Sequence, residues 1–141
     1  MKPAAVNREH SKIAIFLHSG EYDRLHQGLS IAAAAVASAR PVEIFCFWWA
    51  LERLARGRLD EPDFAPARED IVERFEAKSV PTLRSLLGLL RESEHCAIYA
   101  CTGSMAIAGL APELVERSVG QMVGWTTILQ LTSGVTDRFY L

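Results

Sequence analysis

The chain has 141 residues, of which 50% are hydrophobic and 23% are charged, and its formal net charge is −2. This length suits one domain with a core of its own. The slightly negative charge and the absence of a Lys/Arg cluster argue against a nucleic-acid-binding protein. The longest run of small apolar residues, 31–37, is far shorter than the ~20 residues that cross a bilayer, so we expect no membrane span. The segment "MKPAAVNREHSK" lacks the apolar stretch of a signal peptide, so a cytoplasmic protein is expected.

Short apolar runs alternate with segments of helical spacing along the chain. The runs that predict strands are 12–17, 42–48, 95–100, 120–125 and 137–141. Helices are expected from Asp23, as N-cap, to about residue 39, and over 49–56, 81–93, 104–109, 112–119 and 126–133. The alternation predicts a single-domain, three-layer α/β fold over residues 12–141, with a mainly parallel, roughly five-stranded sheet. Residues 1–11 are interpreted as a disordered or extended tail, and residues 57–80 as an irregular lid or insertion.

The residues that follow the predicted strands are candidates for a site. In an open parallel sheet, ligands bind at the carboxyl ends of the strands, where the strand order reverses. With the common order 2-1-3-4-5, this point lies between the first and third strands, and tryptophans expected at the ends of the second and fourth strands would flank it. The candidate site residues are His18, Ser19, Gly20, Trp48, Trp49, Cys101, Thr102, Gly103, Ser104 and Trp125.

Cys101 is the candidate for chemistry at this edge. The helix expected after it, with Ser104 as N-cap, would present unpaired backbone N–H groups and a dipole, and both favour a thiolate. Gly103 would let a reacting partner come close to that backbone. The alternative is that Cys101 only packs, because free cysteine is among the most buried residue types.

The other two cysteines are interpreted as structural. Cys46 lies inside the predicted second strand and is expected in the core. Cys96 and Cys101 are five residues apart on one strand, which separates them by roughly 16 Å and points them to opposite faces. This separation excludes a disulfide, and the sequence has neither a CxxC nor an HExxH motif. We expect no metal site and no cofactor.

Several stretches resemble one known family, in the order in which that family has them. They are "IAIFLHSGEYDRLHQGLSIAAAA", "VEIFCFWWALERLARG", "VPTLRSLLGLL" and "IYACTGSMAIAGLAPELVERSVGQMVGWTTIL", which cover most of residues 12–141. The sequence resembles the DsrE/DsrF/DsrH-like family, and within it the peroxiredoxin-like branch. The chain departs from that branch in residues 57–80 and at Ala50, where a glycine is common. The matching residues are Cys101, Ser104, Met105, Gly109, Leu110, Glu113 and Gly124, with His18, Ser19, Gly20 and Asp23 in the first loop.

The resemblance implies a small α/β fold in homo-oligomers and a role in sulfur transfer. In this interpretation Cys101 carries sulfane sulfur as a persulfide, with His18 as the second candidate catalytic residue, and the protein acts as a sulfurtransferase-like carrier. The expected partners are sulfur-donor and sulfur-acceptor proteins, such as rhodanese-like proteins or small sulfur carriers. Self-association is also expected because Trp48 and Trp49 would form an exposed apolar patch.

Three other functions remain open at this point. The protein could be a small-molecule-binding module with an aromatic pocket at the strand ends, where Cys101 only packs. It could be a Cys-His hydrolase with His18 as base, for which Asp23 is the available orienting carboxylate. It could also be a thiol-dependent redox protein, although the sequence shows no dedicated resolving cysteine, so a sulfenic acid on Cys101 would need an outside thiol.

Overall fold

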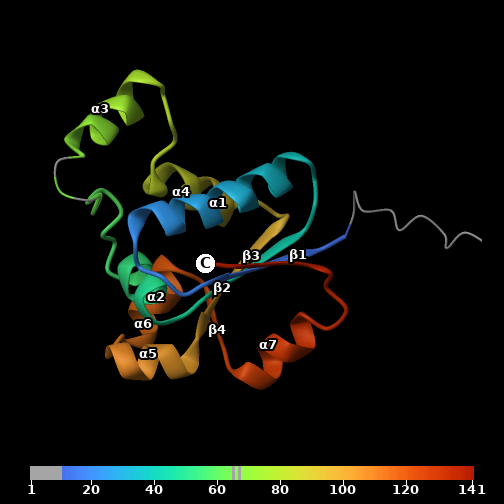
Figure 1. The fold of residues 1–141 in the computed structure, drawn as a ribbon. Coiled ribbons are helices and arrows are strands. Elements are labelled where there is room, and N and C mark those ends of the chain that lie inside the picture. The colour runs from blue at the N-terminus through green and yellow to red at the C-terminus, as the bar shows by residue number, and fades with distance from the viewer. Residues whose placement is uncertain (1–10, 65, 67) are drawn as a thin grey trace, which may run out of the picture.

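Strands and helices alternate along the described chain, which comprises residues 11–64, 66 and 68–141 of a computed structural model (Figure 1). Residues 1–10 of the expected tail lie outside the described residues. The strands are β1 (Ile13–Leu17), β2 (Val42–Cys46), β3 (Cys96–Cys101), β4 (Gln121–Val123) and β5 (Asp137–Tyr140). The helices are α1 (Tyr22–Ala37), α2 (Trp48–Ala55), α3 (Glu69–Ala77), α4 (Leu83–Glu92), α5 (Thr102–Ala108), α6 (Pro112–Ser118) and α7 (Trp125–Leu131).

The five strands form one parallel sheet in the order β4-β3-β2-β1-β5. The predicted α/β fold with a parallel, five-stranded sheet is therefore confirmed. The predicted order 2-1-3-4-5 is wrong, because β2 lies between β1 and β3 rather than at an edge. The side chains of β2 are buried on both faces of the sheet, with Ile44 and Cys46 on one face and Phe45 on the other. A strand with two apolar faces is favoured in the interior of a parallel sheet, where helices cover both sides.

The chain steps in one direction from β1 to β4 and then returns past the whole sheet to β5. Because crossovers between parallel strands are right-handed, steps in one direction place their helices on one face, and the return step places its helix on the other. Helices α1, α2, α4, α5 and α6 contribute to the core on the first face, and α7 contributes Ile128 to a second core on the opposite face. Figure 1 shows the sheet between α7 on one side and α1 with α4 on the other.

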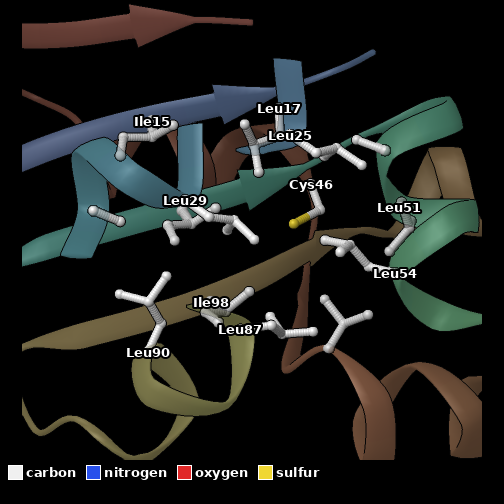
Figure 2. Packing of buried hydrophobic residues seen from close by; sticks show 14 of the residues in the cluster. Ile15, Leu17, Leu25, Leu29, Cys46, Leu51, Leu54, Leu87, Leu90 and Ile98 are labelled. Atoms are coloured by element: carbon white, nitrogen blue, oxygen red, sulfur yellow. The ribbon is translucent and has the colours of Figure 1, made fainter. Parts of the chain in front are cut away.

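The larger core is aliphatic and lies under α1, α2 and α4. Leu25 and Leu29 of α1 and Leu90 of α4 are fully buried against the sheet, and burying each such side chain contributes roughly 1.5–3 kcal/mol. Figure 2 shows the sulfur of Cys46 among the leucines of this core. Cys46 is 0% exposed, which confirms its predicted place in the core.

The smaller core, on the α7 face, is built on a row of stacked aromatic rings. One residue from each of four neighbouring strands contributes a ring, in the order Tyr99, Phe45, Phe16 and Tyr140. Successive ring centroids are 5.2, 5.3 and 4.8 Å apart, and the rings are nearly parallel. The four residues are direct cross-strand neighbours, so the strand register itself sets the stacking.

Asp23 and Pro81 do not start the helices that were predicted to begin with them. Asp23 lies in the first turn of α1, after the N-cap residue Glu21, and its carboxylate accepts a hydrogen bond from the next amide along the chain. Thr82 rather than Pro81 caps α4, because its Oγ1 accepts a hydrogen bond from the Ser85 amide at 3.1 Å.

Three tryptophans begin helices instead of ending strands. Trp48 and Trp49 are the first residues of α2, and Trp125 is the first residue of α7. Ser104 is buried in the first turn of α5, whose N-cap residue is Cys101. The second and fourth strands were predicted to be longer than they are, because apolar residues follow β2 and β4 directly in the turns at the sheet edge. Among the described helices, none is long and apolar enough to cross a bilayer.

Gly120 is required where the chain leaves α6 for β4. A Cβ on Gly120 would lie 2.0 Å from the carbonyl oxygen of Ile98 in β3. We expect Gly120→Ala to lower the free energy of unfolding by about 1–3 kcal/mol, because the strand backbone has to shift. The matched control is Gly88→Ala in α4, whose new Cβ would meet nothing within 4 Å and should stabilise the helix by about 0.5–1 kcal/mol. Urea unfolding followed by circular dichroism measures both, and equal midpoints for the two variants would contradict this packing.

Candidate functional site

Cys101 stands at the corner where β3 turns into α5. It is the last residue of β3 and the N-cap residue of α5, and its backbone is extended, with φ −72° and ψ 122°. Ser104 and Met105 anchor the helix by pointing into the protein, and Gly109 ends it in the left-handed conformation at φ 65°. The corner therefore holds the thiol at the carboxyl edge of the sheet.

The strand order reverses next to Cys101. The loop after β3 leads to α5 on one face of the sheet, and the loop after β4 leads to α7 on the other face. Cys101 is paired with Val123 of β4, and a Cβ on Gly124 would lie 3.7 Å from Thr102 Oγ1, so the two loops are close where they diverge. Such a crevice is where open α/β sheets bind ligands. The reversal predicted beside Cys101 is present, but between β3 and β4 rather than between the first and third strands.

A cavity of about 630 Å³ opens at this edge, on the face that α7 covers. Small-molecule sites typically enclose about 300–1,000 Å³. The lining comes from β1, β3 and β5, from the loops after β1 and β2, from the first turns of α1 and α2, and from α5 and α7. Its residues are Phe16, His18, Ser19, Arg24, Phe47, Trp48, Cys101, Gly103, Ser104, Ile107, Trp125, Ile128, Leu129, Thr132, Arg138, Tyr140 and Leu141.

The Cys101 thiol is enclosed by this cavity. Cys101 is 4% exposed, which is less open than the sequence suggested, so reagents reach the sulfur through the cavity. A Cβ on Gly103 would lie 3.9 Å from Cys101 Sγ, so the glycine leaves the space beside the sulfur free. The Cys101 side chain makes no hydrogen bond to the amides of α5.

Flat aromatic rings and aliphatic side chains form the walls of the cavity. The Trp125 ring stacks on Phe47 with centroids 5.1 Å apart and an interplanar angle of 19°. Phe16 and Tyr140, from the stacked row on the sheet, form the floor. Three large side chains at the opening of the cavity remain exposed: Trp125 is 56% exposed, Ile107 63% and Tyr140 68%.

The ionisable side chains that line the cavity are basic, apart from Cys101 and Tyr140. They are His18, Arg24 and Arg138, and none of the described lining residues is Asp or Glu. Arg24 forms an exposed ion pair with Glu21 at 3.4 Å. Arg138 is held by main-chain carbonyls at the end of α7, and no carboxylate pairs with it among the described residues. The charged side chains that line the cavity are therefore basic.

The loop after β1 is held in place by neighbouring backbone. The His18 and Ser19 amides both donate hydrogen bonds to the Leu141 carbonyl at 3.1 Å, and the His18 carbonyl accepts one from the Ala50 amide at 3.1 Å. Gly20 lies so close to α2 that a Cβ there would be 2.9 Å from the Trp49 carbonyl oxygen. Trp48, the residue before Trp49, has φ 43°, a rare and strained value for a bulky side chain.

Arg53 is a buried arginine that ties this loop to the segment 57–80. Its guanidinium donates hydrogen bonds to the carbonyls of Gly20, at 2.7 Å, and of Arg58 and Glu61, and it pairs with Asp63 at 3.2 Å. Arg53 is 6% exposed, so its charge depends on these partners. Sequence reasoning missed this residue, which looks like an ordinary polar position of a short helix.

The segment 57–80 lies away from the cavity. Helix α3 has no fully buried residue and contacts α1 through Phe75, whose ring lies 5.9 Å from Tyr22 and 5.3 Å from His26. The described residues of this segment do not line the cavity around Cys101. In Figure 1 the segment extends beyond α1 and α4, on the side opposite α7.

Seven of the ten predicted site residues line the cavity, and three do not. Gly20 packs against α2, Trp49 is 55% exposed beside it, and Thr102 is exposed at the start of α5. The residues that line the cavity as predicted are His18, Ser19, Trp48, Cys101, Gly103, Ser104 and Trp125. The sequence did not indicate Arg138 or Tyr140, because their role follows from β5 pairing with β1.

His18 and Cys101 are not neighbours, although both line the cavity. Because β2 lies between their strands, the strand ends that carry them are about 10 Å apart. The Asp23 carboxylate hydrogen-bonds an amide in its own helix turn and does not line the cavity. The geometry therefore does not assemble the Cys-His-Asp arrangement that a hydrolase needs.

Cys46 and Cys96 lie on the other face of the sheet from Cys101. Both pack with the aliphatic core, whereas Cys101 packs with Phe16 and Phe45, which confirms the predicted opposite orientation of Cys96 and Cys101. Burial raises the pKa of the Cys46 thiol to about 12, with a smaller contribution from Cys96, and burial also raises the pKa of Cys96 to about 12. Both remain thiols at neutral pH.

The described residues contain no group of three or more His, Cys, Asp or Glu side chains that could hold a metal ion.

Comparison with protein-family models gives no match, and comparison with curated proteins gives none either. The resemblance to the DsrE/DsrF/DsrH-like family therefore stays a prediction.

The burial of the Cys46 thiol makes the free energy of unfolding depend on pH in the alkaline range. The pKa of this thiol is raised from 9.0 to about 12 in the folded protein, so between these values the folded state binds more protons than the unfolded chain. Its contribution is fully present below pH 9.0 and is lost as the pH rises toward 12. The free energy of unfolding of Cys46→Ala should therefore fall less steeply with pH in this range than that of wild type. The difference between the two slopes should be up to about 1.4 kcal/mol per pH unit. Urea unfolding at several pH values tests this, and parallel curves for wild type and variant would contradict it.

Proposed function

We propose that this protein is a sulfur carrier in which Cys101 holds sulfane sulfur as a persulfide and exchanges it with thiol partners. The observation that carries the proposal is that, of the three cysteines, Cys101 alone lines the cavity at the ligand-binding edge of the sheet. The family resemblance of the sequence supports the same role. Rhodanese-like proteins and small sulfur carriers are the partners that this resemblance implies.

The transfer needs one nucleophile and no change in net oxidation state. The Cys101 thiolate attacks the outer sulfur of a donor persulfide, an S–S bond forms on Cys101, and the donor leaves as a thiolate. In the second step an acceptor thiolate attacks the outer sulfur, the new S–S bond breaks, and Cys101 is released as a thiolate. A proton returns to whichever thiolate has the higher pKa.

The electrostatics of the cavity fit anionic sulfur. Both the thiolate and the persulfide are anions, which positively charged side chains attract. Arg24 and Arg138 bring positive charge to the cavity, and His18 adds more when it is protonated. Because β2 separates the strands that carry His18 and Cys101, we assign His18 to the approach of anions rather than to a role as base on the sulfur.

The redox alternative is less well supported by the positions of the other cysteines. A resolving cysteine must reach the sulfenic acid, but Cys46 and Cys96 pack on the opposite face of the sheet. A peroxidase cycle on Cys101 would therefore need a thiol from outside. Persulfide carriage requires a single cysteine, which is what the cavity holds.

Partner proteins would contact the apolar rim of the cavity. Trp48 and Trp49 are 37% and 55% exposed next to each other, with ring centroids 5.7 Å apart. Exposed apolar patches of this kind mark protein contacts. A sulfur-exchange partner and a second copy of this chain are both expected to use this surface.

The test is the mass of the intact protein after incubation with polysulfide or thiosulfate. We expect wild type to gain ~32 Da, one sulfur atom, and to lose it again on reduction. Cys101→Ser should gain nothing, because the remaining cysteines are protonated and packed on the other face. Loading of Cys101→Ser to the wild-type level would refute the proposal.

Matched variants separate chemistry from folding. Cys46→Ala and Cys96→Ala remove the other thiols one at a time and should load like wild type. His18→Ala should slow loading without abolishing it, since Arg24 and Arg138 remain in the cavity. Circular dichroism of each variant checks that the fold is kept.

A further inference from the structure

We propose that the cavity beside Cys101 is a binding site for a small organic anion with a flat apolar body. The inference rests on the shape, lining and charge of the cavity and does not depend on persulfide formation. It identifies the ligand by its chemistry: a planar ring system or similar apolar body that carries a carboxylate, sulfonate or comparable group.

The size of the cavity suits a small molecule. Its volume of about 630 Å³ lies in the middle of the range of about 300–1,000 Å³ typical of sites for such ligands. The cavity continues past Cys101 along the sheet as far as Arg138 of β5.

The surfaces inside the cavity suit a flat apolar body. The Trp125 ring, stacked on Phe47, forms one wall, and Tyr140, stacked on Phe16 at 4.8 Å, forms part of the floor. Trp125 and Tyr140 are 56% and 68% exposed, so each has ring surface left for a ligand. Aromatic rings prefer such offset-stacked partners.

The charge of the cavity selects an anion. Arg138 Nε donates a hydrogen bond to the Val135 carbonyl at 3.0 Å, and Nη2 donates one to the Thr132 carbonyl at 2.7 Å. These bonds fix the guanidinium at the end of α7 but leave its charge without a carboxylate partner among the described residues. An arginine held in this way is suited to bind a carboxylate or sulfonate. No Asp or Glu side chain from the part of the chain that the structure describes lines the cavity.

The experiment compares two fluorescent probes with the same ring system. One is 1-anilinonaphthalene-8-sulfonate, and the other is N-phenyl-1-naphthylamine, which lacks the sulfonate. We expect wild type to bind one sulfonate probe per chain, about tenfold or more tightly than the neutral probe, because the anion gains a charged hydrogen bond. Equal affinity for the two probes would overturn the proposal.

Variants locate the binding to the two ends of the cavity. Arg138→Gln should lower the affinity for the sulfonate probe to that for the neutral probe, whereas Arg138→Lys, which keeps the charge, should retain the preference. Trp125→Ala should weaken the binding of both probes. The control is Arg117→Gln, because Arg117 is an exposed residue of α6 outside the cavity. This substitution should change the affinity for neither probe. If Arg138→Gln and Arg117→Gln bind the sulfonate probe alike, the anion is not held at Arg138 and the proposal fails.

A second readout ties the probe to the cavity itself. A bound sulfonate probe should slow the alkylation of Cys101 by iodoacetamide, because the reagent reaches the sulfur through the same space. Unchanged alkylation at saturating probe would place the probe elsewhere and contradict the proposal. Cys101→Ser should still bind the probe, so loss of sulfur loading and loss of anion binding are distinguishable.

Discussion

Among the described helices, one short helix packs on one face of the sheet, and the cavity follows from the mismatch in size between this helix and the sheet. Helix α7 has seven residues and is about 10 Å long, whereas five strands span about 19 Å. The opposite face carries α1, α2, α4, α5 and α6, which pack together over the aliphatic core. The area that α7 leaves uncovered is filled in part by the row of aromatic rings on the sheet, and the remainder is the cavity that Cys101 lines.

The same arrangement separates the three cysteines chemically. Because successive residues of a strand point to opposite faces, Cys96 and Cys101 lie on different sides of the sheet although they share β3. Cys46 and Cys96 face the aliphatic core, where burial raises their pKa values and keeps them protonated. Cys101 faces the incompletely covered side and lines its cavity. The position of one residue in the strand register therefore decides which thiol meets ligands.

Local patterns in the sequence predicted the elements of this fold, but not their neighbours. The apolar runs located the five strands to within one or two residues, although only β1 and β2 are almost fully buried and β4 and β5 are largely exposed. The order of the strands was missed, although the two apolar faces of "VEIFCF" are a signal for an interior position. Arg138 and Tyr140 were missed for the same reason: they join the site because β5 pairs with β1. Cys101 was found because a cysteine between a strand and a helix is recognisable from local sequence.

The position of sulfur after loading tests the central claim most directly. Wild-type protein would be loaded with polysulfide, alkylated with iodoacetamide while folded, digested, and analysed by tandem mass spectrometry. Our account predicts that the peptide containing Cys101 carries the alkyl group through an extra sulfur atom, and that the peptides of Cys46 and Cys96 do not. An extra sulfur on Cys46 or Cys96, or on none of the three, would contradict it.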